Sequence, residues 1–215
     1  MTVPARPDVL PPGFRILPGR LDGAAQAALV GLLRAAVGEA PFFQPTMPRT
    51  GKPFSVRMTN LGPLGWVSDR EGGYRYQPLH PVTGRPWPPI PAPVMEVWRD
   101  VSGVACPPEA CLVNCYAPGA RMGLHQDRDE QDLRAPVVSI SLGDACLFRI
   151  GGTERSDPTR SLRLSSGDVV VLGGASRLAF HGVDRIYPGT SRLLAGWLPE
   201  GGRINLTLRR VTPPG

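Results

Sequence analysis

A series of short segments with β-strand character in the C-terminal half constrains the fold of this chain more than any other feature. These segments span residues 111–116, 137–142, 145–150, 161–164, 168–172, 177–180 and 203–210. Turn sequences such as Ala117-Pro118-Gly119 and Ser166-Gly167-Asp168 separate them. Short strands at even spacing with turns between them are typical of an antiparallel sandwich or barrel. We therefore expect a β core over about residues 111–210.

Two amphipathic segments precede this core and predict helices. Asp22 is suited to cap the first helix, which we expect to end at Gly38 and Pro41. Its apolar residues recur at helical spacing: Leu29, Leu32, Leu33, Ala36 and Val37. The second helix is expected from about Pro93 to Val101. Helices followed by a β core indicate an α+β fold.

The length of 215 residues fits one domain, and 26 Pro with 26 Gly indicate many turns and loops. Residues 1–20 are Pro-rich and predict an extended N-terminal arm, which ends in an edge strand over residues 14–17. Residues 42–91 are dense in Gly, Pro, Tyr and Trp. Long irregular segments inside a compact domain are often functional lids or binding loops, so we expect one there.

Charge and cysteine usage limit the class of protein. A net charge of +6 favours polyanionic partners such as nucleic acid. The N-terminus has no apolar signal segment and the chain has no long apolar run, so we expect a cytoplasmic protein without a membrane span. We expect the four cysteines to be free and buried. Structural zinc is a weaker alternative, because their spacing lacks the paired CxxC pattern.

The pattern Leu124-His125-Gln126-Asp127, with a second imidazole at His181, predicts a metal site. Period-two spacing places His125 and Asp127 on one face of an extended segment. Two imidazoles and one carboxylate occupy one face of an octahedral metal, as in non-haem Fe(II) oxygenases. The same residues also fit a structural role, with His125 capping a turn, Asp127 solvated and His181 in the core.

The last expected strand, residues 203–210, alternates between an apolar and a polar face. Ile204, Leu206 and Leu208 share one side, and the opposite side carries Arg203, Asn205, Thr207 and Arg209. If the polar face lines the barrel, its two guanidinium groups can pair with a dicarboxylate cosubstrate. Asn114 and Tyr116 likewise share one face of an earlier strand and offer an amide and a phenol.

A set of motifs in fixed order identifies a family. They are Asn114-x-Tyr116-x-Pro118-Gly119, Leu124-His125-Gln126-Asp127, Leu133-Arg134-Ala135-Pro136, Gly167-Asp168-Val169-Val170, His181-Gly182 and Arg203-x-Asn205-Leu206-Thr207-x-Arg209. In these motifs, and from roughly Leu29 to Arg210, the chain resembles the AlkB family of Fe(II)- and 2-oxoglutarate-dependent dioxygenases. The resemblance is closest to its bacterial members, because Met58-Thr59-Asn60, Leu64-Gly65-Trp66 and Pro86-Trp87-Pro88 also match.

The resemblance implies a double-stranded β-helix, or jelly-roll, in which His125, Asp127 and His181 hold Fe(II). It also implies that 2-oxoglutarate chelates the iron, with Arg209 pairing its distal carboxylate. The residues implied to assist around the cosubstrate are Asn114, Tyr116, Arg203 and Asn205. With O2, 2-oxoglutarate would be oxidised to succinate and CO2, while an N-alkyl group is hydroxylated and leaves as formaldehyde.

The resemblance further implies a substrate and a site for it. The expected substrates are bases such as 1-methyladenine and 3-methylcytosine, in single- or double-stranded DNA or in RNA. A base flipped out of the helix would stack on Trp66 opposite His125, and Asp129 would contact its exocyclic amino group. The other residues implied near the nucleotide are Met58, Tyr74, Tyr76 and Arg155. Residues 42–91 would form the nucleotide-recognition lid of a monomer.

Two features depart from the family pattern, and two other functions stay open. An extra glycine in Glu71-Gly72-Gly73-Tyr74 and the poorly matching residues 46–53 leave the shape of the lid undecided. One alternative is a non-catalytic nucleic-acid-binding jelly-roll with a structural metal. The other is a 2-oxoglutarate oxygenase that acts on a protein or a small molecule.

Overall fold

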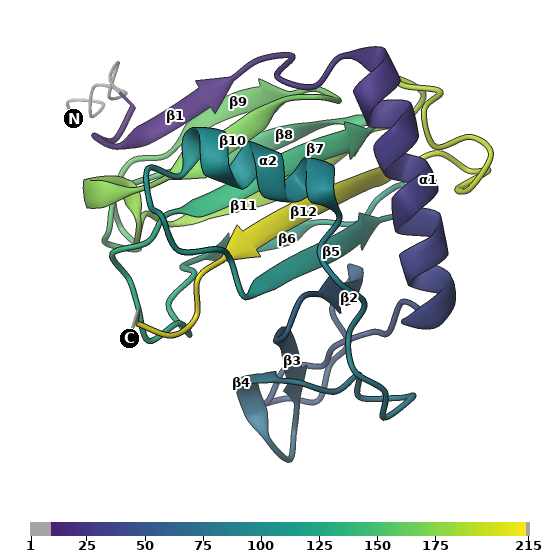
Figure 1. Cartoon of the computed structure of the whole chain (residues 1–215). Coiled ribbons are helices and arrows are strands. Elements are labelled where there is room, and N and C mark those ends of the chain that lie inside the picture. Colours follow the sequence, from purple (N-terminus) through teal and green to yellow (C-terminus); the bar gives the residue numbers. More distant parts are fainter. Residues whose placement is uncertain (1–9, 214–215) are drawn as a thin grey trace.

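A computed structural model describes residues 10–213, so the first half of the expected N-terminal arm lies outside the described residues. The larger of its sheets has six antiparallel strands (Figure 1). In spatial order these are β1 (Phe14–Leu17), β10 (Val169–Leu172), β7 (Val137–Gly143), β12 (Arg203–Arg209), β5 (Ala110–Tyr116) and β2 (Arg57–Leu61). The expected edge strand at residues 14–17 is thereby confirmed.

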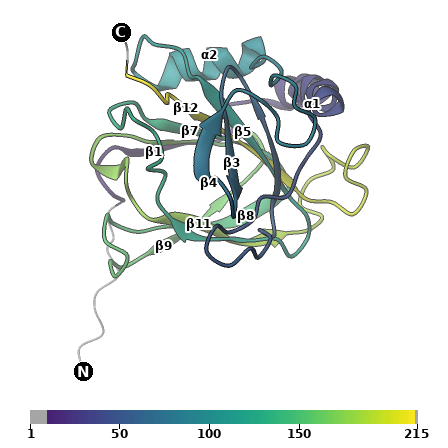
Figure 2. The ribbon, with the colours of Figure 1, turned by 90° about the horizontal axis from the view of Figure 1, so that it is seen from below.

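A second sheet of four strands faces the first, and the two sheets enclose the centre of the molecule (Figure 2). Its order is β6 (Met122–His125), β11 (His181–Tyr187), β8 (Ala145–Ile150) and β9 (Arg160–Leu164). All of these strands pair antiparallel. Two facing antiparallel sheets with crossovers between them confirm the predicted jelly-roll core.

Helices α1 (Gly23–Glu39) and α2 (Ala92–Val101) cover the outer face of the six-stranded sheet (Figure 1). Asp22 caps α1 as expected, because its carboxylate accepts a hydrogen bond from the amide of Ala25 at 2.8 Å. Leu29 and Leu33 are buried against the sheet. Two details of the prediction were wrong: α1 continues through Gly38, and Leu32 is 45% exposed because it lies away from the sheet.

The alternation of β12 sorts its side chains between two environments. Ile204, Leu206 and Leu208 are fully buried in the core cluster that also holds the apolar faces of α1 and α2. The intervening polar side chains, among them Arg203 and Arg209, line the space between the two sheets. The polar face of β12 therefore points into the jelly-roll, as the sequence predicted.

Residues 42–91 contain more regular structure than their composition suggested. They supply β2 and a separate hairpin, β3 (Gly65–Asp69) with β4 (Gly73–Gln77), which lies across the end of the two facing sheets (Figure 2). At the hairpin turn, Gly73 has a φ of +66°, a conformation that glycine adopts at low cost. The extra glycine of this chain therefore belongs to the turn.

The segments around the third expected metal ligand were predicted incorrectly. Residues 177–180 do not form a strand, because the amides of Arg177 and Ala179 bond locally to Gly174 and Ser176. Strand β11 instead begins at His181. It was missed because a register shift between Val183 and Arg185 interrupts its alternation and places charged residues in mid-strand.

Candidate active site

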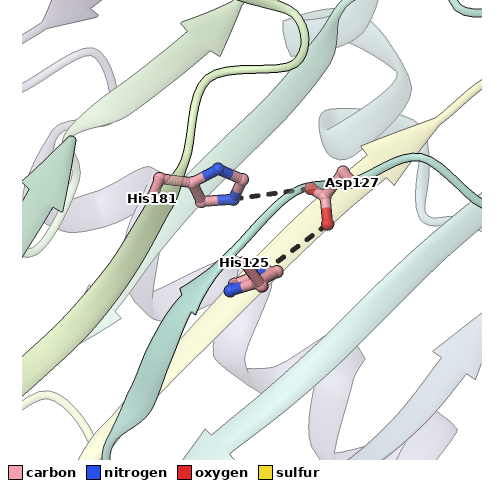
Figure 3. A group of neighbouring side chains, drawn as sticks. All are labelled: His125, Asp127 and His181. Atoms are coloured by element: carbon pink, nitrogen blue, oxygen red, sulfur yellow. Dashed lines mark ion pairs between the residues drawn. The ribbon is translucent and has the colours of Figure 1, made fainter. Parts of the chain in front are cut away.

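Three side chains meet at one edge of the four-stranded sheet. The antiparallel pairing of β6 and β11 sets His125 directly opposite His181, and Asp127 follows two residues after His125 (Figure 3). Each imidazole Nε2 lies 3.6 Å from one oxygen of the Asp127 carboxylate. The ligand atoms of all three residues lie within 4.8 Å of one another. This spacing fits a facial metal site.

A glycine after His181 allows this close approach. A Cβ at Gly182 would lie 2.6 Å from the carbonyl oxygen of Met122 in β6. Any larger residue would push β11 away from β6 and separate the two imidazoles. The His181-Gly182 dipeptide therefore couples a metal ligand to the strand contact that positions it.

Hydrogen bonds to the backbone orient both imidazoles. The Nδ1 of His125 lies 2.9 Å from the carbonyl oxygen of Gly123, and the Nδ1 of His181 lies 3.0 Å from that of Ala179. A carbonyl only accepts, so each Nδ1 carries the proton. Each Nε2 then presents its lone pair toward Asp127, as metal ligation requires.

The protonation states also suit a metal site. Burial and the neighbouring His181 lower the pKa of His125 to about 4, so its imidazole is neutral near pH 7. Burial by itself would raise the pKa of Asp127, but Arg209 and the two imidazoles outweigh it and hold this pKa well below its usual range. The neutral imidazole of His125 and the charged carboxylate of Asp127 are therefore available as ligands.

A cavity of about 660 Å³ opens between the sheets beside these ligands. The residues predicted from the sequence that line it are Met58, Trp66, Tyr74, Asn114, Tyr116, His125, Asp127, Asp129, Arg155, His181, Arg203, Asn205 and Arg209. Segments distant in the sequence thus contribute to one site. Of the predicted residues, Tyr76 is the exception, because it does not line this cavity.

Arg203 lies in the interior with incomplete hydrogen bonding. Its side chain is 1% exposed, and it donates to the Ser141 hydroxyl at 2.6 Å and to the Asp144 carbonyl at 3.4 Å. Its Nε has no partner, and neither has the side-chain oxygen of Asn114. Buried polar atoms without partners cost free energy, so these atoms indicate a place for a polar ligand.

Arg209 lies at the metal ligands. Its Nη2 donates to Asp127 Oδ1 at 2.6 Å, and its Nη1 donates to Glu130 Oε1 at 3.0 Å. The Arg209 Nε is buried without a partner. These contacts place the Arg209 guanidinium beside Asp127, one of the three side chains that could hold a metal.

Trp66 and Tyr74 form an aromatic wall at the cavity. Their rings stack with centroids 5.6 Å apart and an interplanar angle of 20°. The indole nitrogen of Trp66 donates to the carboxylate of Asp129 at 2.8 Å, and this bond fixes the plane of the ring. Arg155 packs over the Phe180 ring at 5.2 Å, close to the chain segment that leads into β11. An aromatic wall beside a carboxylate suits a flat cationic ligand.

Two functional residues were missed in the sequence. No role was expected for Glu130, and Arg177 was expected only as part of a strand over residues 177–180. In the structure the Arg177 guanidinium donates to the carbonyls of Asp127 and Ala135 and to the Glu130 carboxylate. No local pattern reveals these contacts, since they join residues 42 to 50 positions apart. The only sequence signal was an acidic residue and an arginine, each close to a metal ligand.

Within residues 10–213 the triad is the one group of His, Cys, Asp or Glu side chains placed to hold a metal. All four cysteines are free, as predicted, and Cys111, Cys115 and Cys146 are buried, whereas Cys106 is partly exposed and departs from the prediction. The same residues contain no helix that is long and apolar enough to cross a membrane.

Comparison with known proteins agrees with this geometry. Residues 13–209 match the 2OG-Fe(II) oxygenase superfamily. The α-ketoglutarate-dependent dioxygenase AlkB homolog of Caulobacter vibrioides is 59% identical over 96% of this chain and 91% of its own length. The α-ketoglutarate-dependent dioxygenase AlkB of Escherichia coli is 43% identical over 87% of this chain and 85% of its own.

Two further relatives extend the comparison. The DNA N(6)-methyladenine demethylase ALKBH1C of Arabidopsis thaliana is 33% identical over 94% of this chain, which spans 49% of that protein. The solved structure of OsALKBH1 superposes with a TM-score of 0.77 at 32% identity, covering 94% of this chain and 100% of that one. The chain therefore belongs to the AlkB family of the 2OG-Fe(II) oxygenase superfamily, and it is an Fe(II)- and 2-oxoglutarate-dependent dioxygenase.

Proposed function

We propose that this dioxygenase removes alkyl groups from N-alkylated bases such as 1-methyladenine and 3-methylcytosine in DNA, with RNA as a second substrate. The observation that carries the proposal is the aromatic wall of Trp66 and Tyr74, joined to Asp129, in the same cavity as the His125–Asp127–His181 triad. The function in the name of the Arabidopsis thaliana relative supports a nucleic-acid substrate.

The triad would hold Fe(II) through His125 Nε2, Asp127 and His181 Nε2. When bound with 2-oxoglutarate and O2, the iron supplies oxidation of a C–H bond, and 2-oxoglutarate becomes succinate and CO2. Hydroxylation of an N-methyl group gives a product that breaks down to formaldehyde and the unmodified base. The protein contributes the position of the substrate and of the cosubstrate.

We assign the two arginines of β12 different roles toward 2-oxoglutarate. Arg209 is bonded to Asp127, so it lies at the metal end, where the keto-acid group would chelate. Arg203 lies six positions earlier on the same face, buried, with an Nε that lacks a partner. A carboxylate that accepts from a buried guanidinium gains a charge-assisted bond. Arg203 therefore takes the distal carboxylate, in place of Arg209.

The remaining predicted cosubstrate residues surround the space between these arginines. Asn114 keeps an unpartnered side-chain oxygen, and burial raises the pKa of Tyr116 far above its ordinary value, so its phenol stays protonated. Asn205 is held by the hydroxyl of Ser139 and the carbonyl of Ile140. A neutral phenol and amides between two guanidinium groups suit a dicarboxylate.

The base would enter from the side of the β3–β4 hairpin, which we propose as part of a nucleotide-recognition lid over residues 42–91. Trp66 offers its ring for stacking, and one oxygen of Asp129 already accepts from that ring, which leaves the other for an exocyclic amino group. Met58 lines the same region, and Arg121, Arg128 and Arg155 line the cavity with positive charge suited to phosphates.

Formaldehyde release tests this proposal. Purified enzyme with Fe(II), 2-oxoglutarate and O2 should release formaldehyde from a single-stranded oligonucleotide that carries 3-methylcytosine, and none from the unmodified oligonucleotide. The matched control is His181→Ala, which removes one ligand. Succinate formation without formaldehyde from any methylated oligonucleotide would support a protein or small-molecule substrate instead. A monomeric state and a cytoplasmic location stay predictions.

A further inference from the structure

We propose that Tyr76 is a positioning residue that couples the β3–β4 hairpin to the iron-binding carboxylate through Glu130 and Arg209. The sequence suggested a nucleotide contact for Tyr76, but its side chain does not line the cavity. It faces the core of the protein instead. The inference rests on the proposed function only in taking Asp127 as a metal ligand.

An unbroken series of hydrogen bonds joins Tyr76 to Asp127. The Tyr76 hydroxyl donates to Glu130 Oε1 at 2.5 Å, and it accepts from Arg209 Nη1 at 3.0 Å. The same Nη1 donates to Glu130 at 3.0 Å, while Arg209 Nη2 donates to Asp127 Oδ1 at 2.6 Å. One guanidinium thus bridges the hairpin phenol and the metal ligand.

The series is shielded from water. The side chains of Glu130, Arg209 and Asp127 are 0%, 7% and 4% exposed, and Arg177 occupies the second oxygen of Glu130 at 2.9 Å. Burial raises the pKa of Tyr76 far above its ordinary value, so the phenol keeps its proton and acts as a donor to Glu130. Hydrogen bonds in such an environment strengthen one another.

Apart from Tyr76, the outer strand of the hairpin, β4, has few polar contacts with the core. β4 pairs along its backbone with β3, its only partner among the described strands. β3 is held by Asn60, which bonds both the amide and the carbonyl of Trp66, and by the Trp66–Asp129 bond. Tyr76 therefore connects the strand that carries Tyr74 to Arg209.

Coupling of this kind works in both directions. If metal and 2-oxoglutarate fix Asp127 and Arg209, they also favour the arrangement in which Arg209 and Glu130 bind Tyr76. By thermodynamic linkage, closure of the hairpin then favours metal and cosubstrate to the same degree. A tyrosine that acted only in packing would stabilise the hairpin equally in the presence and absence of ligands.

The test compares Tyr76→Phe with Tyr187→Phe, which removes a hydroxyl from a ring that lies under Arg163 outside the cavity. Amide hydrogen exchange of residues 65–77 is measured with and without Mn(II) plus 2-oxoglutarate. We expect ligands to slow exchange in the wild type and in Tyr187→Phe. In Tyr76→Phe this protection should fall on the order of tenfold, the usual effect of losing a bond to a charged group.

Kinetics provide a second readout that a folding defect would not reproduce. We expect the KM for 2-oxoglutarate to rise about tenfold in Tyr76→Phe, with a smaller change in kcat. Glu130→Gln, which removes the charge that Arg209 and Tyr76 share, should show the same loss of ligand-dependent protection. Ligand-dependent protection at the wild-type level in both variants would overturn the inference. Absence of Mn(II) binding to the wild type would instead contradict the metal site of the proposed function.

Discussion

Arg209 donates a hydrogen bond to the metal-ligand carboxylate of Asp127 over 2.6 Å, with both side chains buried. This pair joins β12 to the loop after β6, so the strand that carries the two arginines proposed to bind the cosubstrate also orients a proposed ligand of the iron.

Arg209→Leu should weaken metal binding. It leaves the carboxylates of Asp127 and Glu130 without their shared cation, and breaking a buried ion pair costs about 3 to 5 kcal/mol. We expect a matching fall in the free energy of unfolding and a weaker affinity for Mn(II) in a titration of the folded protein. Arg209→Lys is the control, because it keeps the charge and should lose less. Mn(II) affinity equal to the wild type in Arg209→Leu would contradict this role.

Arg203→Leu should weaken 2-oxoglutarate binding while leaving the metal site intact. Truncating one partner of a buried, hydrogen-bonded charge pair costs about 2 to 5 kcal/mol, so the Kd for 2-oxoglutarate should rise at least tenfold. Isothermal titration with Mn(II) measures the metal affinity, and titration with 2-oxoglutarate in the presence of Mn(II) measures the cosubstrate affinity. If 2-oxoglutarate binds Arg203→Leu as it binds the wild type, the distal carboxylate has another partner.

The sequence predicted the parts of this site that local patterns encode. Alternation in β12 placed Arg203 and Arg209 in the interior, and the spacing of His125 and Asp127 placed both on one face. Prediction from the sequence failed for contacts between residues that lie far apart in the chain, because the fold alone brings these residues together. The register shift in β11 interrupts its alternation, so this strand was not predicted. The hydrogen bond between Arg177 and Glu130 joins residues that come together only in the folded protein. The roles that we propose for Arg209 and Tyr76 depend on contacts of the same kind.

Trp66→Ala should weaken binding of methylated oligonucleotides without affecting the cosubstrate. Stacking of a base on an aromatic ring contributes about 1 to 3 kcal/mol, so the Kd should rise roughly five- to 150-fold for the methylated single strand. Trp66→Phe keeps a ring and should retain part of the affinity. Fluorescence anisotropy of a labelled oligonucleotide measures this. Wild-type affinity in Trp66→Ala would place the base elsewhere.

Acid should destabilise the C-terminal segment through Glu109. Burial would raise its pKa, but hydrogen bonds from Thr212 and Val211 outweigh burial and lower it below the ordinary value of 4.5. Because the folded pKa is the lower one, the stabilisation is complete above the unfolded value and is lost as pH falls through the folded pKa. The free energy of unfolding should therefore fall less between pH 7 and pH 3 in Glu109→Gln than in the wild type. An identical fall would show that Glu109 does not contribute.

The mass of a methylated oligonucleotide before and after reaction tests the central claim most directly. A single strand with one 3-methylcytosine is incubated with the enzyme, Fe(II), 2-oxoglutarate and O2, in parallel with His181→Ala. We predict that the wild type lowers the mass by that of one methylene group and that the variant leaves the mass unchanged. The account would be contradicted if the wild type converts 2-oxoglutarate to succinate but leaves the mass unchanged, both for 3-methylcytosine and for 1-methyladenine.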